Sequence, residues 1–221
     1  MLPLHTTRKD RERKNSKYLL ATCAIWVKHS PGQGNRLAGT GSLVKNFFED
    51  EKIHLITSKE VISTDAVNSY FLRFKKLNGS DKRRRELNSI GNKVEFISPG
   101  LAIVHVDPDK VSFIRKRTSG LLTYRPFAIC AEENEGNSEL YFHVVKRSGS
   151  KSFDIISCTA YEISTETENV DQDRKSLGAP VAITTKHGEA KIVGVITRDN
   201  NMQIYRALFS QIDRSRVCSG W

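Results

Sequence analysis

Apolar residues recur along this chain in short segments of alternating apolar and polar positions, and these segments are broken by Gly, Asn, Asp, Ser and Pro. Such a pattern is typical of β-strands, whereas the i, i+3, i+4 spacing of an amphipathic helix is hardly sustained. It predicts twelve strands, at residues 19–29, 39–48, 52–62, 68–77, 93–99, 101–106, 126–130, 139–147, 153–163, 179–186, 190–197 and 202–208. Many short strands favour an all-β fold, either a pair of six-stranded Greek-key barrels or a large sandwich.

The segments between the strands predict how the chain is organised. Residues 107–117 and 208–216 have the composition of two short helices, the second of them near the C-terminus. Residues 1–17 are polar and charged, so we expect a flexible basic tail there. Residues 117–126 are rich in turn-forming residues and are expected to link two halves of the chain.

Composition narrows the class of protein. With 221 residues, of which 38% are hydrophobic, the chain can form a substantial core. Its four cysteines lie at positions 23, 130, 158 and 218 without a C-x-x-C pair, which predicts no metal site, no cofactor and no dense disulfide framework. No segment has the pattern of a signal peptide or a membrane span, so the sequence predicts an intracellular protein, cytoplasmic or nuclear.

The net charge of +10 is unevenly distributed and suggests one class of partner. The run Lys82, Arg83, Arg84 and Arg85 is expected to form a basic loop. A basic loop can contact phosphates without reading sequence, so nucleic-acid association is one possible function. Charged, solvated loops without a ligand are the other interpretation of the same run.

Four segments, in order, carry a resemblance to a known family. They are "GTGSLV" (39–44), "HLITSKEVI" (54–62), "GLAIVHV" (100–106) and "KSLGAPVAI" (175–183), and the last is followed by "IVGVIT" (192–197). This order resembles that of the trypsin-like (chymotrypsin-fold) serine proteases over about residues 18–210. The resemblance implies one domain at 18–221, built from two six-stranded Greek-key β-barrels at about 18–118 and 124–210, with a short C-terminal helix.

The resemblance also locates the catalytic positions of the family in this sequence. The base position falls on Glu60, the acid position on Gly100 and the nucleophile position on Leu177. A serine hydroxyl needs an imidazole to take its proton and a carboxylate to orient that imidazole. A glutamate carboxylate is too weak a base for this step, glycine has no side chain and leucine has no nucleophile. We therefore expect a degenerate protease, or pseudoprotease, without triad chemistry.

The residues before Leu177 depart from the family pattern as well. Ser176 stands one position before the expected nucleophile, where a tight loop directs neighbouring side chains differently. Lys175 occupies a glycine position of the loop whose amides would stabilise an oxyanion. Weak hydrolysis through Ser176 remains an alternative. A cysteine nucleophile is not expected, because Cys23 and Cys158 lie in apolar strands.

The leading functional hypothesis is a protein-binding or scaffold module. A protease fold without chemistry could keep its cleft, or the edge of the strand "KIVGVITRDN", for an extended peptide. The residues expected to line this site are Thr197, Arg198 and Asp199. Of the histidines, His54 and His105 lie in apolar strands, where surface or core positions are more typical than catalytic ones. No membrane partner is expected.

Overall fold

The computed structural model describes the β-strands and the turns next to them. The residues described are 21–28, 34–45, 47–48, 52–62, 69–74, 83–86, 93–97, 100–107, 117–118, 121–122, 127–129, 141–147, 153–159, 176–184, 190–198 and 204–209. The predicted tail at 1–17 lies outside them.

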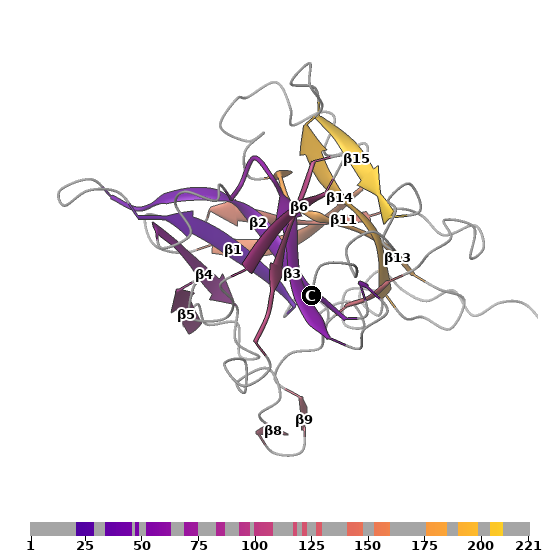
Figure 1. The fold of residues 1–221 in the computed structure, drawn as a ribbon, viewed down its shortest axis with the longest axis horizontal. Helices are drawn as coiled ribbons and strands as arrows, with labels where there is room; N and C mark the ends of the chain where they lie inside the picture. The colour runs from indigo at the N-terminus through magenta and orange to yellow at the C-terminus, as the bar shows by residue number, and fades with distance from the viewer. Residues whose placement is uncertain are drawn as a thin grey trace, which may run out of the picture.

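Fifteen strands make up the described structure (Figure 1). In the first half of the chain they are β1 (Thr22–Val27), β2 (Arg36–Lys45), β3 (Ile53–Ser58), β4 (Tyr70–Phe74), β5 (Arg83–Glu86), β6 (Lys93–Ile97) and β7 (Leu101–His105). In the second half they are β8 (Arg117–Thr118), β9 (Leu121–Leu122), β10 (Phe127–Ile129), β11 (Tyr141–Arg147), β12 (Phe153–Thr159), β13 (Pro180–Thr184), β14 (Ala190–Arg198) and β15 (Ile204–Leu208).

The all-β prediction is confirmed, because each of the twelve predicted segments contains a strand and the described residues form no helix. Three strands were not predicted: β5 and the two members of the small β8–β9 hairpin. The hairpin lies within the predicted link at 117–126. The predicted helix at 107–117 falls almost wholly outside the described residues. Only the first two residues of the predicted helix at 208–216 are described: Leu208 is the last residue of β15, and Phe209 lies in a 3₁₀ turn.

Thirteen of the fifteen described strands pair within one large sheet that runs through both halves of the chain, and β8 and β9 form a separate pair. Antiparallel pairing gives the order β5-β4-β1-β2-β3-β7-β6 in the first half, so the strands at its two ends are neighbours in the sequence. In the second half the order is β12-β11-β13-β14, with β15 also on β14. The short strand β10 joins the halves by parallel pairing with β2 and β14. The division into two six-stranded barrels remains a prediction.

Strand β1 shows why several segments read as nearly continuous apolar runs. Cys23 and Ile25 point into the main core, whereas Ala24 and Trp26 point to the other face and belong to a second, smaller cluster. Trp26 stacks on Phe71 of β4 at 6.4 Å between ring centroids. Both faces of β1 are therefore buried, so the strand needs apolar residues at odd and even positions alike.

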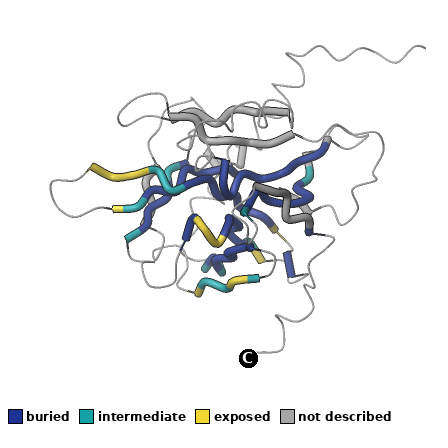
Figure 2. Tube along the Cα trace, turned by 90° about the horizontal axis from the view of Figure 1, so that it is seen from above, coloured by how far each residue is buried: buried dark blue, intermediate teal, exposed yellow. Residues whose placement is uncertain are grey.

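The main core draws on both halves. Leu43, Leu55 and Ile103 from β2, β3 and β7 share one cluster with Ile192 and Val195 of β14. Figure 2 shows long buried stretches among the strands that it colours by burial. Because burial of apolar side chains is the main stabilising contribution to folding, the shared core holds the loops of the two halves against each other.

No helix in the part of the chain that the structure describes is long and apolar enough to cross a membrane.

Candidate functional site

The loops carrying the predicted catalytic positions meet at one place, here called the loop crossing. It comprises Thr40, residues 57–60, Gly100, residues 176–179 and residues 196–197. Three backbone hydrogen bonds tie residues 177–179 to both halves: Thr40 N–H donates to Leu177 O (2.9 Å), Gly178 N–H to Ile196 O (2.8 Å) and Ile196 N–H to Ala179 O (2.9 Å). A fourth joins Lys59 N–H to Gly100 O (2.9 Å). Segments far apart in the sequence therefore converge here, as the resemblance implies.

The nucleophile position is closed by packing. The side chain of Leu177 is 3% exposed and belongs to the main core. Gly178, next to it, has a φ of +78°, which an L-residue with a side chain rarely adopts. Leu177 thus serves as a core residue at the end of a tight turn, and its side chain supplies neither a donor nor a nucleophile.

The acid position lies in the hairpin between β6 and β7. Gly100 has a φ of +98°, and its N–H donates to Ile97 O (3.0 Å), an arrangement typical of three-residue hairpin loops that end in a left-handed residue. A Cβ added to Gly100 would lie 2.8 Å from Thr197 Oγ1. Both the backbone and the neighbouring hydroxyl therefore favour glycine at this position.

Two buried hydroxyl groups occupy the space beside the acid position. Thr197 Oγ1 donates to Gly100 O (3.1 Å) and lies 2.8 Å from Ser58 Oγ. Since Thr197 uses its proton on Gly100 O, Ser58 is the donor to Thr197, and Ser58 Oγ in turn accepts from Glu60 N–H (3.3 Å). The hydroxyl chain from Glu60 N–H to Gly100 O connects β3, β14 and the β6–β7 hairpin without any ionisable side chain.

The base position faces solvent. Glu60 and its neighbour Lys59 are exposed in the turn after β3. Thr57, at the end of β3, is buried and donates from Oγ1 to Thr40 O (2.6 Å). The backbone of this turn is thus fixed to the loop crossing, while the side chain of Glu60 extends away from the core.

The alternative nucleophile, Ser176, is only 6% exposed. Its carbonyl oxygen accepts a hydrogen bond from Ala179 N–H (2.9 Å), which closes the turn around Leu177. Lys175 lies outside the described residues. The thiol of Cys23 is fully buried, and burial raises its pKa far above the ordinary value despite a hydrogen bond from the backbone of Gly41 that lowers it. A thiol held protonated in this way is a poor nucleophile.

The expected peptide-binding residues lie at the end of β14. This strand pairs with β13 and β10 over Ala190–Val195 and with β15 over Gly194–Arg198, so among the described strands Thr197 and Arg198 pair with β15 alone. The side chain of Thr197 is fully buried in the hydroxyl chain, so it supports the loop crossing from inside, and a peptide site at these residues stays a prediction. Arg198 is partly exposed, and Asp199 lies outside the described residues.

The basic run also differs from expectation. Arg83, Arg84 and Arg85 do not lie in a loop but form β5 with Glu86, paired with β4 from Phe71 to Phe74. A strand at the end of a sheet needs only its backbone for pairing, and charged side chains are common there. Lys82 lies outside the described residues. Nucleic-acid association through this run stays a prediction.

A histidine cluster that sequence reasoning did not assemble lies at the other end of β3. His54 is fully buried and is the register partner of His105 on β7, with 5.1 Å between ring centroids. Phe48 packs on both rings, at 4.9 Å from His54 and 5.7 Å from His105. At about 3.3 Å per residue, His54 lies roughly 13 Å along the strand from Ser58. Neither histidine is placed to act as a base at the loop crossing.

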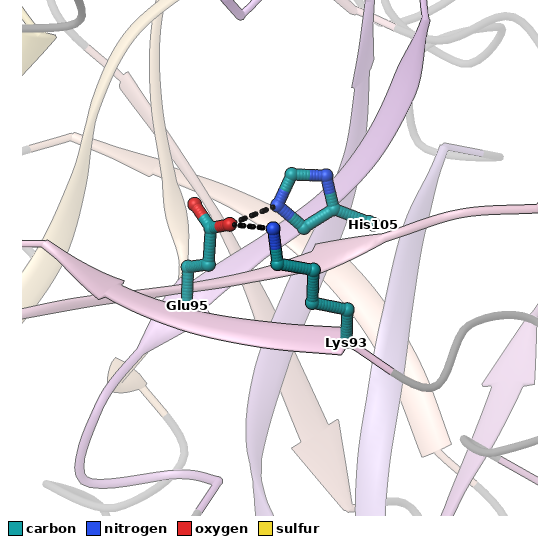
Figure 3. A network of polar contacts seen from close by, with 3 residues as sticks. All are labelled: Lys93, Glu95 and His105. Atoms are coloured by element: carbon teal, nitrogen blue, oxygen red, sulfur yellow. Dashed lines mark ion pairs between the residues drawn. The ribbon is translucent and has the colours of Figure 1, made fainter. Parts of the chain in front are cut away.

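A carboxylate and an ammonium group border this cluster on β6 (Figure 3). Glu95 Oε1 lies 2.6 Å from Lys93 Nζ and 3.1 Å from His105 Nε2, although the imidazole contact lacks good hydrogen-bond geometry. Burial by itself would raise the pKa of Glu95, but Lys93 and His105 together outweigh it, so the pKa is lower than the ordinary value. The described residues contain no group of three or more side chains suited to hold a metal ion.

The lowered pKa of Glu95 predicts how stability depends on pH. A carboxyl group with a lowered pKa in the fold stabilises it above the unfolded pKa and loses this contribution as the pH falls through the folded pKa. We therefore expect the urea midpoint of the natural protein to exceed that of Glu95→Gln at pH 7, and the difference to shrink as the pH falls below the ordinary pKa of glutamate, about 4.3. A difference that is constant across this range would contradict the assignment.

The hydroxyl chain predicts a second effect on stability. Thr197→Val keeps the volume but leaves Gly100 O without the hydroxyl donor and Ser58 without an acceptor, which should reduce the free energy of unfolding by about 1–3 kcal/mol. Thr197→Ser keeps the hydroxyl and is the matched control, with a smaller loss from the missing methyl group. Chemical denaturation of both variants measures the difference. Equal losses would contradict a role for the hydroxyl chain.

Comparisons with known proteins give likeness in structure alone. No family model matches the chain, and no curated protein matches it. One similar solved structure is that of Deg5, with 14% identity over 88% of this chain and 87% of that chain, at a TM-score of 0.48. Another is a serine endoprotease from Yersinia pestis, with 14% identity over 94% of this chain and 63% of that chain, at a TM-score of 0.45. Because both TM-scores are below 0.5, the strand order and the contacts of the loop crossing are the firmer basis for a function.

Proposed function

We propose that this chain is a trypsin-like protease homologue that has lost triad chemistry and acts as a protein-binding module. The observation that carries the proposal is the loop crossing itself. Its backbone is fixed by hydrogen bonds, yet its three catalytic positions hold an exposed Glu60, a Gly100 without a side chain and a buried Leu177. This combination supports a retained framework with a different use.

The chemistry available at the crossing supports binding over hydrolysis. A nucleophile, a base that contacts it and a group that orients the base must converge within hydrogen-bond distance. The crossing offers instead the hydroxyls of Ser58 and Thr197, which are buried and engaged with each other. The exposed side chains of the loop crossing are those of Lys59 and Glu60, and Arg198, the next residue of β14, is partly exposed. Neighbouring charges of both signs suit recognition of a polar, extended peptide.

Loss of hydrolysis can be tested directly. The full-length protein, incubated with a fluorophosphonate probe and with a broad library of peptide substrates, should show neither labelling nor cleavage. Ser176→Ala is the control for the alternative nucleophile. Labelling that this substitution abolishes would show hydrolysis through Ser176 and contradict the loss of chemistry.

Peptide binding needs a separate experiment. Random peptides displayed on phage would be selected on the full-length protein and then measured by fluorescence polarisation against Glu60→Lys and Arg198→Glu. We expect the selected peptides to bind at least about tenfold more weakly to one of these variants. Lys45→Glu, at an exposed position at the end of β2, is the matched control. Peptides that bind all variants alike would contradict binding at the loop crossing.

A further inference from the structure

Strand β6 presents one edge that pairs with no other strand among the described residues. Its only strand partner there is β7, with Lys93 opposite His105 and Ile97 opposite Leu101. The carbonyl of Ile97 points towards the hairpin, since it accepts from Gly100 N–H. Because backbone groups of alternate residues in a strand point to opposite edges, the N–H and C=O groups of Val94 and Phe96 point away from β7.

The side chains on this strand are unusual for an edge. Phe96 is a large hydrophobic side chain that is 45% exposed. Val94, two residues earlier, lies on the same face and is partly exposed. Lys93 and Glu95 lie on the opposite face, where they form the ion pair seen in Figure 3. An exposed edge with an aromatic side chain is a template for pairing with another strand.

We propose that β6 pairs with β6 of a second copy of this chain, antiparallel about a two-fold axis through Val94. In this register each Lys93 stands opposite Glu95 of the other copy, so two opposite-charge pairs form across the axis. The backbone groups of the two Val94 residues face each other and can exchange hydrogen bonds. Phe96 reaches Val94 of the other copy as a diagonal neighbour, within roughly 7–8 Å.

Charge selects this register over its neighbours. A two-fold axis through Glu95 would place the two Glu95 carboxylates directly opposite each other, and like charges in that position are destabilising. An axis through Phe96 would place Glu95 opposite Ile97 and forfeit both charge pairs. Only the register about Val94 makes the sequence Lys93-Val94-Glu95 complementary to itself.

The expected dimer is weak. A pairing of two short strands buries much less than the roughly 1,200 Å² of a stable interface, so we expect a dissociation constant on the order of 10⁻⁴ M. The net charge of +10 opposes association further at low salt. Sedimentation velocity of the full-length protein across its soluble concentration range, at moderate salt, is the appropriate measurement.

A charge exchange tests the register. Lys93→Glu turns each of the two charge pairs across the axis into a pair of glutamates, and Glu95→Lys turns each into a pair of lysines, so each variant alone should dimerise about tenfold more weakly. An equimolar mixture of the two variants restores opposite charges at both positions and should recover dimerisation. Lys45→Glu changes the net charge by the same amount as Lys93→Glu, away from β6, and is the matched control for that variant. Circular dichroism verifies that each variant is folded.

A second variant keeps the test independent of the charges. Phe96→Ser removes the diagonal contact with Val94 of the other copy and should also weaken the dimer, while its fold is unaffected because the side chain is exposed. A protein that is monomeric at every concentration would overturn the proposal. So would a dimer that withstands Phe96→Ser, or one that both charge variants form as well as the natural protein.

Discussion

Replacing Gly178 with alanine should destabilise the fold by at least about 4 kcal/mol, a loss reached only by severe steric or packing defects. The φ of +78° disfavours any residue with a side chain, and this alone costs about 1–3 kcal/mol. The added Cβ would also overlap Thr40 O and Thr57 Oγ1, the two atoms joined by a buried hydrogen bond. Strand β2, which carries Thr40, and strand β3, which carries Thr57, would have to move apart. This movement would break the hydrogen bonds of the loop crossing as well as the turn at Gly178.

The measurement is urea denaturation followed by the fluorescence of the buried Trp26. Gly34→Ala is the matched control, because a Cβ added at that exposed glycine meets nothing within 4 Å. This control should change the free energy of unfolding by less than about 0.5 kcal/mol. If the two substitutions had similar effects, close packing at Gly178 would not determine stability.

Placing serine at position 177, where the resemblance puts the nucleophile, is expected to damage the protein without creating activity. Leu177 is 3% exposed within the main core, so Leu177→Ser removes its apolar packing and places a hydroxyl among apolar side chains. Large-to-small substitutions in a core cost about 2–5 kcal/mol, and the buried hydroxyl adds to this loss. Leu177→Met, which nearly conserves volume, is the control and should cost less than about 1.5 kcal/mol.

The complete triad should fail for a second reason. In the triple variant Glu60→His, Gly100→Asp and Leu177→Ser, the aspartate Cβ would lie 2.8 Å from Thr197 Oγ1 on a backbone with a φ of +98°. We expect neither fluorophosphonate labelling nor peptide cleavage by this variant, whether or not it folds. Labelling of a folded triple variant would show that only the side chains, and not the surrounding packing, prevent catalysis.

The strands could be predicted because their signal is local. Alternation and short apolar runs are properties of a few consecutive residues, and all twelve predicted segments contain a strand. Strand β5 was not predicted, because it lacks this local signal. Its residues Arg83–Glu86 carry no apolar pattern, and they form a strand because the backbone of β4 is available to pair with them.

The function of individual side chains depended on neighbours distant in sequence. Nothing in the sequence connects Ser58 with Thr197, which are 139 residues apart and joined by a hydrogen bond between buried hydroxyls. Thr197 was therefore expected in an open peptide site. In the same way, nothing in the sequence shows that β15 pairs with β14 along Gly194–Arg198.

The sequence by itself determined the all-β class and the approximate position of most strands, and it supplied the resemblance that places the three catalytic positions of the family on Glu60, Gly100 and Leu177. The tertiary structure alone decided that Leu177 is closed into the core, that Gly100 and Gly178 allow no side chain, and that β6 offers a described edge with an exposed aromatic residue. The physical reason is that strand formation follows local periodicity, whereas burial, close approach and strand order arise only when distant segments pack together.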